Sequence, residues 1–225
     1  MITTNVIHRV FNIHCGDLIG MGFTVEVEGK EYLITAKHVV ESLDGEGNIG
    51  ILSNAEWRKE EVNLVGHSPD DADISVLALT RILTPPNLPM EMISGGAGGV
   101  FYGQDVYFLG FPYGQTGPYA FGDDGYPLPY VKKAIISLLD RKKFILDGHN
   151  NSGFSGGPVV YREPGKDDLN VAAVISSYSF VDEPVFRDGE KTDLTYQYNT
   201  GIIQADSIIW ARELIQANPI GLTVA

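Results

Sequence analysis

The sequence predicts an all-β fold built in two halves, with a single helix at the C-terminus. Three observations predict it: short apolar stretches that alternate with polar residues, frequent turn residues, and one amphipathic segment near the end of the chain. The 26 glycines and 12 prolines among 225 residues indicate many turns, and many turns favour short strands over long helices.

The first half has the pattern of short strands separated by turns. Gly22–Glu28 alternates apolar and polar residues, the period of a half-buried strand, and Tyr32–Ala36 returns as its hairpin partner. Helical periodicity is absent here, apart from a turn at His38–Ser42. The other strands expected in this half are Val6–Ile13, Asn48–Ser53, Glu61–Val65 and Ile74–Leu79.

A break follows the last of these strands. Thr84–Pro89 is rich in proline and Ser94–Gly99 contains almost only small residues, which is typical of a connecting segment. We therefore expect a first domain at residues 1–83, a linker at residues 84–104 and a second domain at residues 105–225.

The strand pattern resumes after the break and then gives way to a helix. Gly114–Pro129 is a long loop, of a length that is usually functional or mobile. Asp206–Gln216 has apolar residues at helical spacing and Asp206 as an N-cap, so we expect an amphipathic helix packed on the second half. The strands expected in this half are Asp105–Phe111, Val131–Leu138, Phe144–Asp147, Gly157–Tyr161, Asn170–Ser176 and Gln197–Gln204.

The formal net charge of −13 bears on the partners of the protein. An acidic surface repels phosphate backbones and anionic lipids, so we expect neither nucleic acid nor a membrane as a partner. Cys15 is the only cysteine; it can form no internal disulfide, and we expect a small buried hydrophobe. The N-terminal segment lacks the pattern of a signal peptide, so a cytoplasmic location is expected, although a mature secreted chain would look the same.

The strongest chemical signal is the Gly-x-Ser-Gly-Gly-Pro pattern of Gly153–Pro158. A nucleophilic serine needs a tight turn that exposes its hydroxyl, and backbone N–H groups that converge on the developing oxyanion. Glycines on both sides permit the backbone conformations of such a turn. The pattern indicates a nucleophile at Ser155, against the plainer interpretation as a Gly/Ser turn between two strands.

Two further residues stand where a base and its carboxylate partner are needed. His38 follows the apolar strand Tyr32–Ala36, and a rigid strand end can hold a base accurately. Asp73 directly precedes the apolar strand Ile74–Leu79, and a hydrogen-bonded aspartate can orient an imidazole. Each signal is weak alone, since a lone histidine there is mostly a packing or surface residue and a lone aspartate mostly caps a turn.

Together the three residues form a recognisable set. Their order along the chain is His, Asp, Ser, which is the order of chymotrypsin and not that of subtilisin or the α/β-hydrolases. On these motifs the chain resembles the trypsin-like serine peptidases of the chymotrypsin class, nearest to the short bacterial members without disulfides. The resemblance covers nearly the whole chain, and further segments that fall in family order are Gly20–Phe23, Thr35–His38, Phe108–Pro112 and the final strand plus helix.

The resemblance implies a fold, an activity and a set of site residues. It implies two six-stranded antiparallel β-barrels with a C-terminal α-helix, and a serine endopeptidase that cleaves proteins or peptides through an acyl-enzyme, without a cofactor. The backbone N–H groups of Gly153 and Ser155 would form the oxyanion hole. Ala173–Tyr178 would pair with the substrate backbone, with Ser176 near Asp73 and with Tyr178 narrowing the pocket entrance. Gly201 would line the primary specificity pocket.

The base of that pocket is implied to be His149, the residue six before the nucleophile. A histidine there disfavours cleavage after Lys or Arg, which needs a carboxylate, and favours a small or medium uncharged side chain. A Glu preference through His149 is a second option. A two-residue shift in the loop would instead place the carboxylate of Asp147 in the pocket.

Two residues depart from the family pattern. Lys37 replaces the usual small residue before the histidine, and we expect it to point away from the imidazole. Phe154 replaces the Asp or Asn that usually precedes the serine. In the digestive enzymes that Asp pairs with a newly cleaved N-terminus. Because Phe154 cannot form such an ion pair, we expect no activation by that route.

Two other functions compete with a constitutive peptidase. One is a catalytically silent or partner-activated binding protein of the same fold, in which Phe154 keeps the site inactive until an activating protein docks. All three triad residues are present, which favours the enzyme. The other is a metal hydrolase, which we do not expect because no HExxH spacing occurs among the five histidines, His8, His14, His38, His67 and His149.

Overall fold

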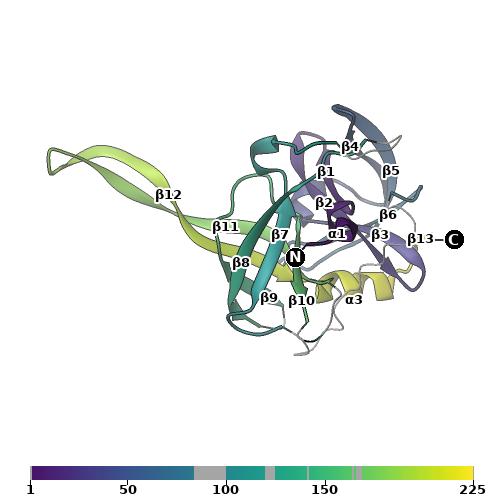
Figure 1. The fold of residues 1–225 in the computed structure, drawn as a ribbon. Coiled ribbons are helices and arrows are strands. Elements are labelled where there is room, and N and C mark those ends of the chain that lie inside the picture. The colour runs from purple at the N-terminus through teal and green to yellow at the C-terminus, as the bar shows by residue number, and fades with distance from the viewer. Residues whose placement is uncertain are drawn as a thin grey trace.

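The first half of the chain forms a ring of antiparallel sheet (Figure 1). The computed structural model describes residues 2–83, 100–119, 125–140, 142–163, 165 and 169–224. Six strands of the first half pair in the order β3-β2-β1-β4-β5-β6, and β3 also pairs with β6, which closes the ring. These strands are β1 (Val10–Cys15), β2 (Leu18–Val27), β3 (Lys30–Thr35), β4 (Glu46–Ser53), β5 (Glu56–His67) and β6 (Ser75–Leu79).

The second half forms a closed barrel of six strands in the order β10-β11-β12-β9-β8-β7. The fold is therefore all-β as expected, with one closed six-stranded barrel, a second ring of sheet and a C-terminal helix. The barrel strands are β7 (Asp105–Gly110), β8 (Tyr130–Leu139), β9 (Lys143–Asp147), β10 (Pro158–Arg162), β11 (Leu169–Arg187) and β12 (Glu190–Ser207).

Smaller elements complete the fold, and two of them differ from the sequence-based expectation. Thr4–Ile7 forms a short helix, α1, so the strand expected from Val6 begins only at Val10. A final strand, β13 (Leu222–Thr223), adds to β3 and was not predicted. One-turn helix α2 (Lys37–Val40) and 3-10 helix η1 (Pro112–Gly114) follow β3 and β7. The expected linker lies largely in residues 84–99, and part of the expected loop in residues 120–124, outside the described residues.

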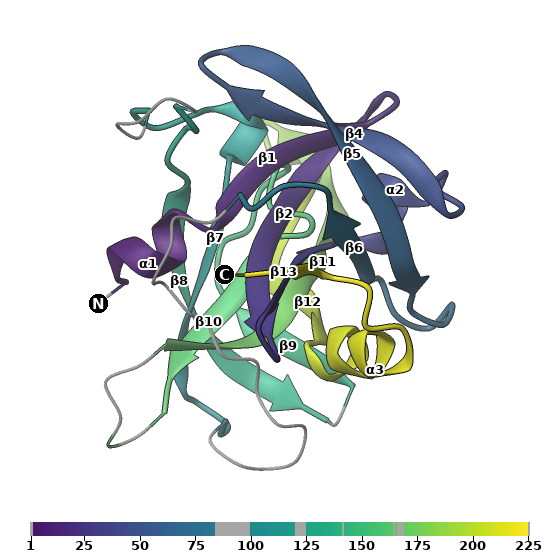
Figure 2. The ribbon, with the colours of Figure 1, turned by 90° about the vertical axis from the view of Figure 1, so that its right-hand side faces the viewer.

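Helix α3 (Ile209–Ala217) joins the two halves. The helix has its main contacts with β5 and β6 of the first half, instead of the second half as expected (Figure 2). Trp210 and Ile215 are buried in a core cluster that also contains apolar residues from both rings of strands. The N-cap expected at Asp206 is wrong, because Asp206 lies in β12 and the helix begins after Ile208.

The longest strands of the barrel, β11 and β12, extend far beyond it as a two-stranded arm (Figure 1). Only their ends near the barrel were expected to be strands. The arm closes at Asp188 and Gly189, which both have positive φ, at 51° and 86°. Positive φ at both central residues is the geometry of the two-residue hairpin turn that Asp-Gly favours. This dipeptide is the sequence signal that would have predicted the arm.

Candidate active site

The pairing of β3 with β6 brings His38 and Asp73 together. β3 ends at Thr35, which is paired with Ser75 at the start of β6. His38 lies in the one-turn helix directly after β3, and Asp73 lies two residues before Ser75. His38 and Asp73 are far apart in the sequence, but both lie at the same end of the β3–β6 pair. A base and its carboxylate partner must be neighbours in this way.

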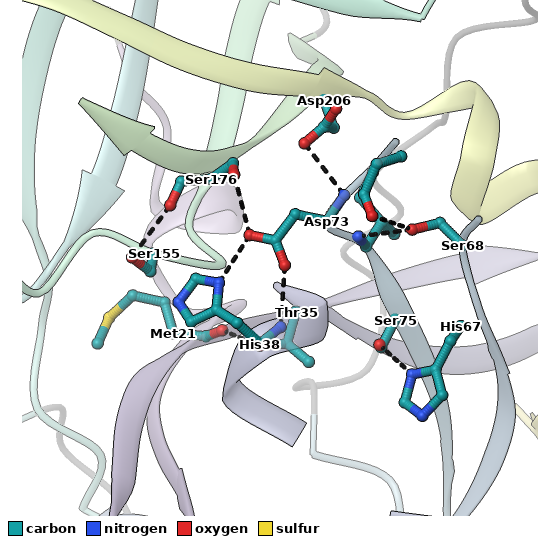
Figure 3. A network of polar contacts seen from close by, with 12 residues as sticks. Met21, Thr35, His38, His67, Ser68, Asp73, Ser75, Ser155, Ser176 and Asp206 are labelled. Carbon is teal, nitrogen blue, oxygen red and sulfur yellow. Dashed lines mark hydrogen bonds and ion pairs between the residues drawn. The ribbon is translucent and has the colours of Figure 1, made fainter. Parts of the chain in front are cut away.

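Asp73 holds His38 with both of its carboxylate oxygens (Figure 3). The backbone N–H of His38 donates to Asp73 Oδ1 across 2.9 Å, and Nδ1 of the His38 ring lies 2.7 Å from Asp73 Oδ2. The hydroxyl of Ser176 also donates to Asp73 Oδ2, across 2.9 Å. Because a carboxylate only accepts hydrogen bonds, this arrangement places the proton of neutral His38 on Nδ1 and leaves Nε2 as its basic nitrogen.

These contacts set the pKa values of the pair. The hydrogen bond to Asp73 raises the pKa of His38 above its ordinary value, against the opposing effect of burial. Burial alone would raise the pKa of Asp73, but the hydrogen bonds from His38 and Ser176 and the charge of His38 outweigh it, and the pKa is lowered. Asp73 is therefore ionised at neutral pH and stabilises the protonated form of His38.

Ser155 lies in the turn before β10, and the first half of the chain holds this turn in place. The backbone N–H of Met21 donates to the carbonyl oxygen of Ser155 across 2.7 Å. The hydroxyl of Ser155 donates to the carbonyl oxygen of Ser176 across 3.3 Å. Among the described residues the Ser155 hydroxyl makes no hydrogen bond to His38, so Ser176 is the residue that connects Ser155 with the His38–Asp73 pair (Figure 3).

Phe154 anchors the serine turn from inside the barrel. Its side chain is fully buried, and its ring meets the ring of Phe108 edge to face with 5.1 Å between centroids. The ammonium group of Lys132 lies 5.3 Å from the centre of the Phe154 ring and also donates to the carbonyl oxygen of His149. An aromatic anchor thus stands where the family pattern was expected to have Asp or Asn.

The backbone before Ser155 fixes the direction of the Gly153 N–H. The carbonyl oxygen of Ser152 accepts the N–H of Tyr113 across 2.8 Å, and that of Gly153 accepts the N–H of Phe111 across 2.9 Å. In a trans peptide the N–H points away from the carbonyl, so the N–H of Gly153 points away from Tyr113. In the described part of the chain, the N–H groups of Gly153 and Ser155 donate to no partner.

Two glycines of the motif are required by close backbone contacts. A Cβ on Gly153 would lie 2.2 Å from the carbonyl oxygen of Phe111, and one on Gly156 would lie 2.1 Å from that of Met21. Both glycines also have positive φ, at 96° and 87°. No other residue fits these positions without a shift of the backbone, which explains the glycines that flank Ser155.

Of the residues expected to line the specificity pocket, Gly201 in β12 lies beside the end of β9. The backbone N–H of Gly148 donates to the carbonyl oxygen of Gly201 across 2.9 Å, and a Cβ on Gly201 would lie 3.7 Å from Asp147 Oδ1. The side chain of His149 is exposed, and Tyr178 is half-buried in β11. Both pocket assignments, through His149 or through Asp147, therefore remain predictions.

Sequence reasoning missed the function of two residues near the site. The sequence pattern predicts a helix cap at Asp206, but the carboxylate of Asp206 accepts the backbone N–H of Asp73 across 3.2 Å. Tyr113 has a φ of 53°, an uncommon conformation for a residue other than glycine, and its N–H orients the Ser152–Gly153 peptide. Neither contact leaves a signal in the sequence, because both join segments that only the fold brings together.

A hollow of about 380 Å³ opens beside the His38–Asp73 pair, lined among others by Ser176, Gln204 and Asp206. Lys37 lies on its rim and donates to Asp70 across 2.9 Å. Among the described residues no group of three or more His, Cys, Asp or Glu side chains is placed to hold a metal ion. No helix in the described part of the chain is long and apolar enough to cross a membrane.

The comparisons with known proteins concern the family and the fold of the chain. The family model of the trypsin-like peptidase domain matches residues 20–166. The Rv3671c protease of M. tuberculosis, in its inactive form, has 18% identity and a TM-score of 0.59, over 95% of this chain and 90% of that one. A serine endoprotease from Yersinia pestis has 21% identity and a TM-score of 0.58, over 96% of this chain and 67% of that one.

A third similar structure, the HtrA-type protease AlgW with a tripeptide, has 21% identity and a TM-score of 0.58. The match covers 95% of this chain and 61% of AlgW, so the chain spans only part of that protein. At these identities the solved structures show a common fold. Comparison with the curated proteins returned no match.

Proposed function

Because the chain belongs to the family of trypsin-like peptidase domains, we propose that it is a serine endopeptidase with Ser155 as nucleophile, His38 as general base and Asp73 as the residue that orients His38. The observation that carries this proposal is the two-point contact between Asp73 and His38, which fixes both the orientation and the tautomer of the imidazole. A general base must present an unprotonated nitrogen to the nucleophile, and Nε2 is that nitrogen here.

The proposed reaction proceeds in two steps. His38 Nε2 takes the proton of Ser155 as Oγ bonds to the substrate carbonyl carbon, and the carbonyl oxygen becomes an oxyanion held by the N–H groups of Gly153 and Ser155. The imidazolium then donates its proton to the leaving amine, which breaks the peptide bond and leaves an acyl-enzyme. Water attacks the acyl group in the same way, with His38 again as base, and releases Ser155.

The contact between Ser155 and Ser176 supports a role of substrate in completing the site. In the free protein the Ser155 hydroxyl donates to the carbonyl oxygen of Ser176. When a substrate strand pairs with β11, the N–H of the residue before the cut donates to the Ser176 carbonyl oxygen in place of the Ser155 hydroxyl. The Ser155 hydroxyl is then released and rotates toward His38 Nε2.

A serine-reactive fluorophosphonate tests this proposal directly. We expect one molecule of reagent per chain, attached to Ser155, as measured by intact mass and peptide mapping. Ser155→Ala should abolish both labelling and the cleavage of denatured casein, with a loss of kcat that approaches roughly 10⁶-fold. His38→Ala should be about as damaging, and near-normal turnover in either variant would refute the assignment.

The second candidate is a partner-activated protein of the same fold. The observation that favours it is the Ser155 hydroxyl bonded to Ser176 and not to His38. If an activating protein is required, the isolated chain should react with the fluorophosphonate at the slow rate of an ordinary serine. Rapid stoichiometric labelling of the isolated chain would exclude this candidate.

A further inference from the structure

One edge of β11 is unpaired from the active site outward. On its first edge β11 pairs with β12 from Ala173 to Arg187. On its second edge the pairing with β10 ends at Val174, and only Ile175 is still bonded, to the serine turn. Beyond Ile175, no strand in the described part of the chain covers this second edge. An unpaired strand edge is a template for another extended chain.

The hydrogen bonds of β11 show which of its residues present their backbone groups to the free edge. The carbonyl oxygen of Ser176 faces this edge, because it accepts the Ser155 hydroxyl. The carbonyl oxygens of Ser179 and Val185 face the other way, since each accepts a threonine hydroxyl of β12. Backbone direction alternates along a strand, and the register shift between Ile175 and Ser177 interrupts this alternation, so the carbonyl oxygens of Ile175 and Ser176 face the same edge. The residues that face the free edge are therefore Ser176, Tyr178, Phe180 and Asp182.

Pro184 ends this series. It is the next residue of the same parity, and it has no N–H group to donate. Proline on an edge strand is a common means of stopping further pairing. The free edge therefore has a defined length, from Ser155 to Asp182, and its outer end is closed to a longer ladder.

We propose that this edge binds substrate as an added antiparallel strand that reaches the seventh residue before the cut. Ser176 lies opposite the substrate residue directly before the cut, and Tyr178 lies opposite the third substrate residue before the cut, as the family resemblance already implies. Phe180 and Asp182 then lie opposite the fifth and the seventh residues. The inference rests on the proposed function for the direction and starting point of the substrate.

The side chains at the outer positions give this extension a chemical preference. Residues directly opposite each other in a sheet share one face. The ring of Phe180 is 52% exposed, so an apolar residue at the fifth position would cover it. Asp182 is exposed on a chain with a net charge of −13, so Lys or Arg at the seventh position is favoured. The substrate class is an unfolded polypeptide segment, since a compact protein or a tripeptide cannot follow the edge.

A second copy of the chain is the other occupant that an open edge admits. The observations favour substrate, because the edge begins at Ser155 and ends at a proline that limits pairing between copies. Charged residues at the tip, such as Arg187 and Lys191, also disfavour edge-to-edge association.

Methylated peptides test the edge separately from catalysis. The protein is the Ser155→Ala variant, and the probe is a fluorescein-labelled synthetic peptide that contains a Val-Ser bond. Nine residues, the valine of this bond included, precede the bond. Counted back from the bond, the fifth residue is valine and the seventh is lysine. N-methylation at the fifth position removes an N–H that faces β11, whereas N-methylation at the fourth removes one that faces away. By fluorescence anisotropy we expect the first to weaken binding about tenfold and the second less than twofold. Equal effects of the two methyl groups would refute the proposal.

A shortened arm tests the same edge in the active protein. Residues Asp182–Gln197 are replaced by Asn-Gly, which joins the opposed residues Val181 and Tyr198 by a two-residue turn and removes Asp182 from the edge. In the parent protein, kcat/KM for the nine-residue peptide should exceed that for a peptide with four residues before the cut by about tenfold. In the shortened variant, which keeps Phe180 but not Asp182, this ratio should fall to about threefold. The methylated peptides keep the proposal testable if the shortened variant does not fold.

The outcomes separate this inference from the proposed function. If neither peptide is cut by the parent protein, the proposed function fails, while peptide binding to Ser155→Ala still tests the edge. If both are cut equally well by the parent protein, the edge proposal fails and the function stands. If sedimentation shows a dimer that the shortened variant loses, a second copy occupies the edge, and the proposal is overturned.

Discussion

The backbone N–H of Asp73 donates to the carboxylate of Asp206, so the proposed orienting residue of the triad is itself held by a second acid. Asp206 is 4% exposed, and its other carboxylate oxygen has no hydrogen-bond partner among the described residues. Burial raises the pKa of Asp206 to about 6; the Asp73 N–H and the charge of Lys143 oppose this rise, and the charges of Asp73 and Asp71 add to it. The unpartnered oxygen indicates that the neutral form is the better accommodated one.

This pKa predicts that Asp206 makes the stability of the protein depend on pH. Below about pH 4 the group is protonated in both the folded and the unfolded chain, and its contribution is fully present. As the pH rises through about 6 the folded chain must ionise a buried group, and up to roughly 3 kcal/mol is lost. Asp206→Asn should therefore gain stability relative to the parent between pH 4.5 and 7.5. Urea unfolding measures this, and a difference that stays constant with pH would contradict it.

The contact between Asp73 and His38 predicts the pH dependence of activity. Because the hydrogen bond to Asp73 raises the pKa of His38, activity should rise with pH through an apparent pKa above 6.5, as the imidazole loses its proton. Asp73→Asn should lower this apparent pKa and reduce kcat by roughly 10⁴-fold. The measurement is kcat/KM between pH 5 and 9 with Ser176→Ala as a milder comparison. A flat profile in the parent protein would argue against His38 as the base.

The burial of Phe154 predicts that the serine turn depends on an apolar anchor. Phe154→Ala should destabilise the fold by about 3–5 kcal/mol and also free the turn that carries Gly153 and Ser155. Phe108→Ala is the matched control, because it removes the other ring of the same contact but lies in β7. We expect similar losses of stability in urea, with a loss of kcat at least tenfold larger for Phe154→Ala. Equal losses of kcat would mean that Phe154 contributes only packing.

The strands of both halves could be predicted because their signal is local. Alternation of apolar and polar residues is visible in a single sequence, and each strand expected from it occurs, with the first shifted to begin at Val10. The arm was missed for the same reason. Its exposed strands alternate little, since no core covers either face, and the residues between Tyr178 and Asn199 offered only the Asp188-Gly189 turn as a signal.

The same difference between local and distant signals applies to the residues of the candidate site. The glycines around Ser155 and the strands next to His38 and Asp73 are local features, so these residues could be identified from their neighbours. The contact of Asp206 with Asp73, and that of Tyr113 with Ser152, join residues that are distant in the sequence. Such contacts depend on how the two halves and the loops pack, which no window of sequence contains.

The last prediction concerns the residue before the cut, where two assignments of the pocket compete. His149 at the base favours a small or medium uncharged side chain, whereas Asp147 beside Gly201 favours Lys or Arg. Because both side chains are exposed, the choice depends on sequence position, and we expect the uncharged preference from His149, six residues before Ser155. Matched peptides that differ only at this residue, with Val, Ala, Glu, Lys or Arg, decide between them by kcat/KM. Under the expected assignment the Val or Ala peptide is cut fastest and Asp147→Asn changes the ranking little. If Lys or Arg is fastest and Asp147→Asn removes that preference by tenfold or more, Asp147 is the pocket residue. A Glu peptide cut fastest, with the preference lost in His149→Ala, would instead assign His149 a direct contact with a carboxylate.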